Sequence, residues 1–218
     1  MDWDRIISRN RDRLLRIVMG LFAYAGLDAG GADVVPRRVW RKIVRLLRPA
    51  EAAVRRLIIL AAQRIDPLAL PLSSEGADEA GETRGSTLRP ARGPRGDRAA
   101  YFRLTDPPRR FDPRLWEGLL PFPEGGVKPR DANEDVDVRP LCRRILLLKA
   151  ALDDIDGHAK RLVLWTTRQA RLPVTARRFS PIRRGHPLGH FKRPTEEIDS
   201  ILYEVHDFAA YALRLDPG

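Results

Sequence analysis

The chain has 218 residues, of which 43% are hydrophobic and 32% charged, and its formal net charge is +11. This hydrophobic fraction excludes a protein that is disordered throughout, and the length fits one domain, or a compact core with irregular arms, rather than two full domains. Of the 40 basic residues 35 are arginines, whose planar guanidinium binds phosphate and carboxylate in bidentate fashion. A GC-rich genome would also favour arginine codons, but the net positive charge itself favours an anionic partner.

The single cysteine, Cys142, excludes an intramolecular disulfide and favours a reducing compartment. Its apolar neighbours predict an inert, buried thiol. No stretch reaches the roughly 18 to 20 apolar residues that a membrane-spanning helix needs, and the acidic residues before Leu14 are atypical of a signal peptide. We therefore expect a cytoplasmic protein without a transmembrane segment.

Residues 2–25 carry apolar side chains at helical spacing. Leu14, Val18 and Leu21 fall on one side at 100° per residue, and a series of arginines falls on the other. This pattern predicts an amphipathic helix. The glycine cluster in residues 26–31 should end it.

A longer helix is predicted over residues 37–65. Pro36 suits a first-turn position, where its missing N–H costs nothing. An apolar series then continues for about eight turns. Pro49 lies inside this series and should either kink one helix or start a second one, because proline removes a backbone hydrogen bond. Residues 1–65 therefore form a predicted N-terminal basic helical region.

The side of this helix opposite its apolar stripe is strongly basic, and Glu51 is the only carboxylate between Arg37 and Gln63. Like charges on successive turns repel, each close pair costing about a few tenths of a kcal/mol, so we expect an anionic partner to neutralise them. The alternative is that carboxylates of residues 134–137 or 153–156 fold back and do so internally. The predicted partner-binding residues are Arg38, Arg41, Lys42, Arg45, Arg48, Arg55 and Arg56.

Two irregular segments are expected in the middle of the chain. Residues 66–100 are rich in Pro, Gly, Ser and mixed charge, which predicts a disordered linker because such a segment buries too little apolar surface to offset its ordering entropy. Residues 101–140 contain more aromatic side chains, but several prolines exclude long regular elements. We expect this extended proline- and aromatic-rich arm to lie over the core or over a partner.

Residues 141–218 are predicted to form a C-terminal helical region that packs with the N-terminal helices. Apolar spacing predicts a helix from about Leu141 to Val163 with a weak point at Gly157. The last helix should begin at Thr195 as N-cap, followed by two glutamates in its first turn. Between the two helices lies a second basic segment, whose candidate anion-contacting residues are Arg177, Arg178, Arg183, Arg184, Lys192 and Arg193.

The sequence contains no phosphate-binding glycine loop, nucleophile elbow, zinc-binding helix motif or paired-cysteine motif. His186 and His190 stand four residues apart, but Pro187 and Gly189 argue against a helix that would aim both at one metal ion. The acidic groups in residues 134–137 and 153–156 fit solvated helix ends and i,i+4 pairs better than general acid–base or Mg²⁺ chemistry. We expect no catalytic residue, no cofactor and no metal.

These patterns predict an all-α fold, a helical core of four to five amphipathic helices with long Pro/Gly-rich irregular arms. The favoured function is a non-enzymatic interaction or scaffolding protein, whose basic face contacts another protein with an acidic face. Nucleic-acid binding without a sequence-reading motif and peripheral binding to an anionic membrane are the alternatives. An enzyme whose site leaves no short-range motif also remains open.

Overall fold

The computed structural model of the protein describes residues 2–69, 101–107, 131–171, 180–182 and 185–214. Within these ranges the long elements are five helices: α1 (Trp3–Tyr24), α2 (Arg37–Ala62), α3 (Arg139–Asp153), α4 (Ile155–Ala170) and α5 (Glu197–Arg214). The short described elements are the 3₁₀ turns η1 (Leu27–Ala29) and η2 (Pro67–Ala69) and the strands β1 (Val34–Pro36) and β2 (Asp135–Asp137). The all-α prediction is confirmed for the described residues. None of their helices is long and apolar enough to cross a bilayer.

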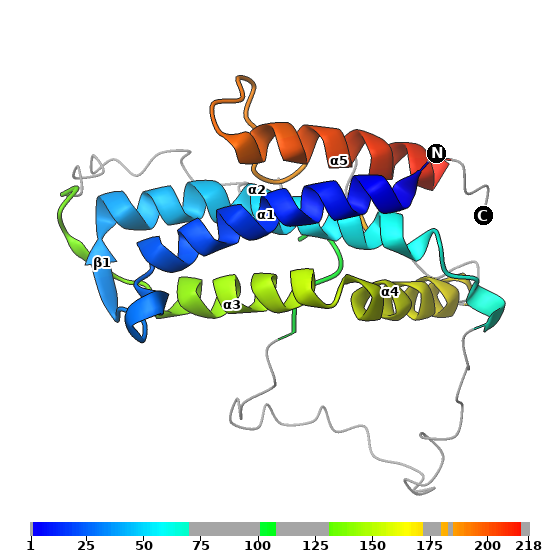
Figure 1. The fold of residues 1–218 in the computed structure, drawn as a ribbon, viewed down its shortest axis with the longest axis horizontal. Helices are drawn as coiled ribbons and strands as arrows, with labels where there is room; N and C mark the ends of the chain where they lie inside the picture. The colour runs from blue at the N-terminus through cyan, green and yellow to red at the C-terminus, as the bar shows by residue number, and fades with distance from the viewer. Residues whose placement is uncertain (1, 70–100, 108–130, 172–179, 183–184, 215–218) are drawn as a thin grey trace, which may run out of the picture.

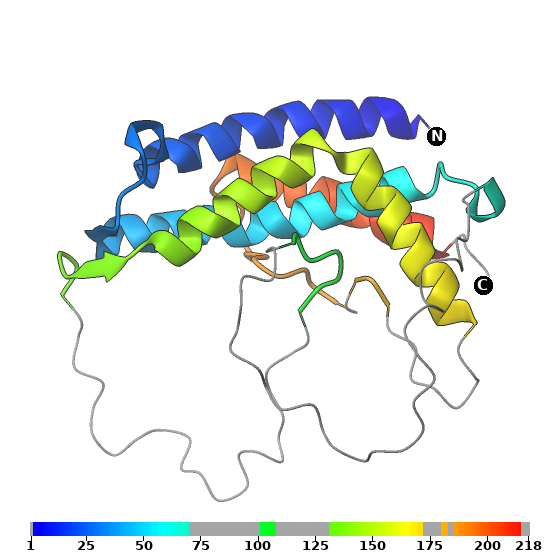
Figure 2. The same ribbon diagram turned by 90° about the horizontal axis from the view of Figure 1, so that it is seen from below.

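Helix α2 is at the centre of the bundle and packs against α1, α3, α4 and α5. Figure 1 shows α5 on one side of α1 and α2, and the α3–α4 pair on the other. In the view turned by 90°, α3 crosses α2 and α4 leaves the end of α3 at an angle (Figure 2). Fully buried side chains such as Leu14, Leu47, Leu148 and Ile201 show that several helices contribute to one core.

Helix α1 forms as its sequence pattern predicts. The carboxylate of Asp2 accepts a hydrogen bond from the amide of Arg5 (3.1 Å), which satisfies one of the free N–H groups at the helix start. Leu14 and Leu21 of the apolar stripe are fully buried. The helix stops before Gly26, whose φ of +67° lies in the left-handed region that favours glycine.

The start of α2 is held by backbone contacts from a distant segment. Strand β1 pairs antiparallel with β2 immediately before the helix. The amide of Arg37 donates to the carbonyl of Glu134 (2.9 Å), and the amide of Arg38 donates to that of Ala132 (3.0 Å). These bonds satisfy two of the free N–H groups of the first turn, so no capping side chain is needed.

Helix α2 continues through Pro49 as a single helix, so no second helix starts at this residue. Proline has no N–H, so the carbonyl of Arg45 loses its usual partner four residues later. The helix ends at Ala62, three residues before the predicted end at Ile65.

The helix predicted from Leu141 to Val163 is divided into α3 and α4 at Asp154. The Oδ1 atom of Asp154 accepts a hydrogen bond from the amide of Gly157 (2.9 Å), so this residue ends α3 and caps α4. The predicted weak point at Gly157 is therefore wrong by three residues. The reason is that an aspartate side chain competes with the backbone for local amide donors.

The predicted N-cap role of Thr195 is also wrong, because α5 begins at Glu197. The Asp199 carboxylate accepts from the amides of Thr195 (3.0 Å) and Glu196 (3.2 Å), and so binds the backbone just before the helix. The hydroxyl of Thr195 accepts a hydrogen bond from Arg45 (3.4 Å) instead. This long-range contact with α2 replaces the local cap that the sequence indicates.

Only parts of the two predicted irregular segments belong to the described residues. Residues 66–69 of the predicted disordered linker end in the turn η2, and residues 70–100 lie outside the described part of the chain. Residues 101–107 of the predicted arm lie on the helical core, where Phe102 is 7% exposed. Residues 108–130 lie outside the described ranges.

Candidate anion-binding site

The basic face predicted on α2 divides into an outer and an inner part. Residues 51–61 of α2 are all buried, since α4, α5 and the segment 101–107 cover this end of the helix. Arg55 and Arg56 are only 4% and 0% exposed. Both side chains are therefore buried in the fold, although the sequence places them among the predicted partner-binding residues.

Arg56 forms a buried, bidentate ion pair with Asp106. Its Nη1 and Nη2 atoms donate to the Oδ1 (2.8 Å) and Oδ2 (2.6 Å) atoms of this carboxylate, whose side chain is 1% exposed. Nη1 also donates to the carbonyl of Ala52 (2.9 Å), and Nε donates to Nδ1 of His206 (3.4 Å). Every nitrogen atom of this guanidinium therefore has a hydrogen-bond partner inside the protein.

Arg55 extends the same buried network. It lies 3.6 Å from Asp106 and 3.7 Å from Glu51, and its Nε donates to the carbonyl of Arg103 (3.1 Å). Burial lowers the pKa of Arg55, an effect opposed by these two carboxylates. Arg144 of α3 completes the network with two hydrogen bonds to Glu51 (2.9 and 2.8 Å).

The internal alternative considered for the basic face therefore holds for its inner part, but with different carboxylates. Glu51 and Asp106 neutralise Arg55 and Arg56. Glu134 pairs with Arg37 at the start of α2, as that alternative expected. The predicted acidic groups of residues 153–156 contact their own helices through pairs such as Lys149–Asp153 (2.6 Å).

Arg45 lies at the boundary between the two parts. It makes a bidentate pair with the buried carboxylate of Asp199 (2.9 and 2.6 Å), and its guanidinium lies 3.5 Å from the ring centroid of Phe191. Burial alone would raise the pKa of Asp199, but hydrogen bonds from Arg45 and two backbone amides lower it below the ordinary value. Arg45 thus connects α2 to the start of α5 and to the preceding loop.

The outer cations are Arg38, Arg41, Lys42 and Arg48, and all four are exposed. Among the described residues, no carboxylate forms an ion pair with any of the three outer arginines. The ammonium group of Lys42 lies 4.6 Å from the ring centroid of Tyr24, and a hydrogen bond with Tyr24 raises the lysine pKa. The three arginines are therefore accessible to an anionic ligand, and Lys42 lies on the same helix.

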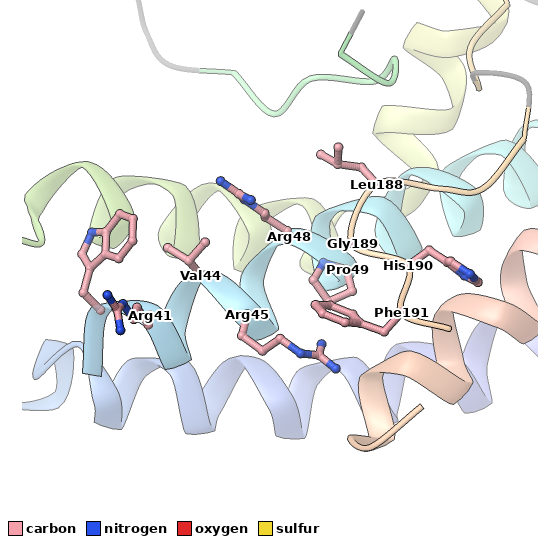
Figure 3. Close-up of a pocket in the computed structure, with 10 residues that line it drawn as sticks. Arg41, Val44, Arg45, Arg48, Pro49, Leu188, Gly189, His190 and Phe191 are labelled. Carbon is pink, nitrogen blue, oxygen red and sulfur yellow. The ribbon is translucent and has the colours of Figure 1, made fainter. Parts of the chain in front are cut away.

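A pocket of about 350 Å³ opens beside the outer cations, between α2 and the loop of residues 185–191 (Figure 3). Arg45 points toward Phe191 in this view, whereas Arg48 points away from it. The lining residues are Trp40, Arg41, Val44, Arg45, Arg48 and Pro49 of α2 and Leu188, Gly189, His190 and Phe191 of the loop.

The loop wall of the pocket is fixed by close packing on α2. Gly189 has a φ of +86°, and a Cβ atom added there would lie 2.6 Å from the nitrogen of Pro49, so only glycine fits. The ring of His190 stacks on that of His186 with centroids 4.0 Å apart, and its Nε2 lies 3.2 Å from the Tyr203 hydroxyl. The pocket wall is therefore preformed.

The secondary basic segment is described only in part. Lys192 and Arg193 are exposed, directly after the loop wall of the pocket. The other four predicted residues, Arg177, Arg178, Arg183 and Arg184, lie outside the described residues. The placement of this second candidate surface thus rests on Lys192 and Arg193.

The remaining candidate groups do not assemble into a metal centre among the described residues. No three His, Cys, Asp or Glu side chains in these ranges cluster as metal ligands would. Cys142 is buried, as predicted, and burial raises the pKa of its thiol.

Sequence patterns do not single out the apolar part of the pocket. Trp40 and Val44 belong to α2, whereas Leu188 and Phe191 come from a loop too short to show any periodicity. Their only sequence signal is the presence of apolar residues in an otherwise basic, Pro- and Gly-containing segment.

No protein-family model, curated protein or solved structure matches the chain.

Proposed function

We propose that this protein is a non-enzymatic interaction protein that binds an acidic surface of another protein through the outer cations of α2. The observation that carries this proposal is the contrast between the two ends of one helix. The inner arginines have internal carboxylate partners, whereas Arg38, Arg41 and Arg48 have none among the described residues. Fixed positive charge of this kind steers and orients an anionic partner.

The structure favours a protein over a membrane as this partner. An amphipathic helix binds a membrane interface by inserting its apolar face among the lipids. In α2 the apolar face already packs against the other helices, since Ile43, Leu47 and Leu57 are fully buried in the bundle. A membrane would meet only the charged side of this helix.

The polar groups of the site disfavour a protein that reads the base edges of nucleic acid, whereas binding to its phosphates is the alternative that the test below separates. Three arginines, one histidine and the indole N–H of Trp40 supply the polar groups of the pocket, and it contains no Asn, Gln, Ser, Thr, Asp or Glu side chain. Readout of base edges uses acceptors as well as donors. Guanidinium groups alone recognise carboxylate and phosphate.

The proposal is tested with a variant that replaces the four outer cations by glutamine. Wild type and variant are titrated at low ionic strength against fluorescent polyglutamate, oligo(dT) and phosphatidylserine vesicles. We expect wild type to bind polyglutamate, and the variant to bind it at least about fourfold more weakly, since four exposed ion pairs at about 0.2–1 kcal/mol each contribute about 0.8–4 kcal/mol together. Thermal melts should be nearly unchanged.

A matched control removes the same charges elsewhere on the surface. It carries three arginines and one lysine changed to glutamine, at the exposed positions Arg5, Arg143, Lys160 and Arg168. Equal losses in both variants would show a response to net charge and contradict a localised site. Tighter binding of oligo(dT) or of the vesicles than of polyglutamate would replace the acidic protein by the corresponding alternative.

A further inference from the structure

The pocket beside the outer cations combines two chemistries in one place. Its sides include the apolar Trp40, Val44 and Leu188, while Arg41 and Arg48 line it with positive charge. Its volume of about 350 Å³ is near the lower end of the range of about 300–1,000 Å³ that ligand pockets occupy. Such a site fits an apolar group that has an anionic group beside it.

The charge around the pocket extends further than one small ligand would need. Arg38 and Arg48 are ten residues apart on α2, which places them about 15 Å apart along the helix axis at 1.5 Å per residue. This distance equals about four to five residues of extended chain at roughly 3.3 Å each. The outer cations therefore match a short acidic peptide segment better than a single carboxylate.

The rigid parts of the pocket reduce the cost of binding. Arg45 is held by Asp199 and stacks on Phe191, and Gly189 packs against Pro49. A preformed wall does not have to be ordered when a ligand enters. The apolar interior can thus contribute to affinity in addition to the surrounding charges.

We propose that this pocket receives one aromatic or large aliphatic side chain of an acidic segment of the partner protein, while Arg41 and Arg48 bind the carboxylates that flank it. This inference rests on the proposed function and specifies the chemistry of the partner. The ligand is a protein segment because the apolar walls of the pocket require an anchoring side chain, and because the outer cations require several anions along one chain.

The test uses fluorescent pentapeptides of sequence Asp-Glu-X-Glu-Asp, with X as Ala, Leu, Phe or Trp, and oligo(dT) for comparison. Fluorescence anisotropy measures their affinity for the full-length protein. The Phe or Trp peptide should bind about tenfold to one-hundredfold more tightly than the Ala peptide, because a large apolar side chain leaves water only in the former.

Variants separate the anchor from the charges. Val44→Phe fills the pocket and should abolish the difference between the Phe and Ala peptides while leaving affinity for the Ala peptide unchanged. Val44→Ala is the matched control and should keep the difference. Leu188→Trp fills the same space from the loop, and serves if Val44→Phe fails to fold. Arg41→Gln with Arg48→Gln should weaken all four peptides.

Each outcome has a distinct meaning. If wild type binds the Ala and Phe peptides equally well, the anchor pocket is wrong and the proposed function stands. If no peptide binds and oligo(dT) does, the proposed function itself fails. If Val44→Phe leaves the preference for Phe intact, the aromatic side chain binds elsewhere and the assignment of this pocket is overturned.

Discussion

Replacing Arg56 by methionine should strongly destabilise the fold. Methionine has an unbranched side chain like arginine but lacks the guanidinium group. The substitution therefore removes the bidentate partner of the Asp106 carboxylate, whose side chain is 1% exposed. Arg55 lies 3.6 Å from this carboxylate, beyond ordinary hydrogen-bond distance, and cannot replace it without moving. Breaking a buried ion pair from one side costs about 3–5 kcal/mol.

This cost can be measured by urea denaturation followed by circular dichroism at 222 nm. In a chain of this size, 1 kcal/mol shifts Tm by about 2–4 °C, so a 3–5 kcal/mol loss corresponds to a fall of roughly 6–20 °C. Arg48→Met is the matched control, because Arg48 lies on the same helix but is exposed. Its free energy of unfolding should change by no more than about 0.5 kcal/mol.

A double-mutant cycle with Asp106→Leu completes the test. The double variant should be less destabilised than the sum of the single changes, because both members of the ion pair are then removed together. A loss under about 1 kcal/mol for Arg56→Met, or equal losses for Arg56→Met and Arg48→Met, would refute the division of α2 into inner and outer parts.

Three further predictions concern stability. Gly189→Ala should destabilise by about 1–3 kcal/mol and weaken pocket binding, since φ is +86° and the added Cβ would meet Pro49; unchanged urea curves would contradict this. Gly157→Ala should not raise the free energy of unfolding by the roughly 1 kcal/mol that this change usually gives in a helix, because the new Cβ would displace the Asp154 cap. A rise in Tm would refute this expectation. Burial and then Arg56 lower the pKa of His206 below 6.5, so stability should be full above this value and fall as pH decreases below it. The pKa values of His158 and His190 are lowered as well, so these two residues contribute to the same pH dependence. A urea midpoint that stays the same from pH 7 to pH 5 would contradict this last expectation.

Much of the local structure of this protein is determined by short-range sequence patterns. The apolar stripes of α1 and α2 and the glycine cluster after α1 depend on neighbours within a few residues, so their periodicity is sufficient to predict them. The errors occur where a side chain acts at a helix end. Asp154 divides α3 from α4, and Asp199 replaces the predicted cap at Thr195, because each carboxylate binds a nearby backbone amide that a periodicity pattern does not represent.

Sequence periodicity predicts even less of the candidate site. Periodicity and composition are sufficient to show that α2 has one apolar and one basic side, and that Glu51 is the only carboxylate within it. Which of its cations are buried depends on tertiary contacts, because Arg56 meets a carboxylate 50 positions away and Arg45 one 154 positions away. A helical wheel gives the direction of each side chain but not what lies opposite it. Burial and pairing depend on long-range packing, which brings the loop of residues 185–191 onto α2 and thereby forms the pocket.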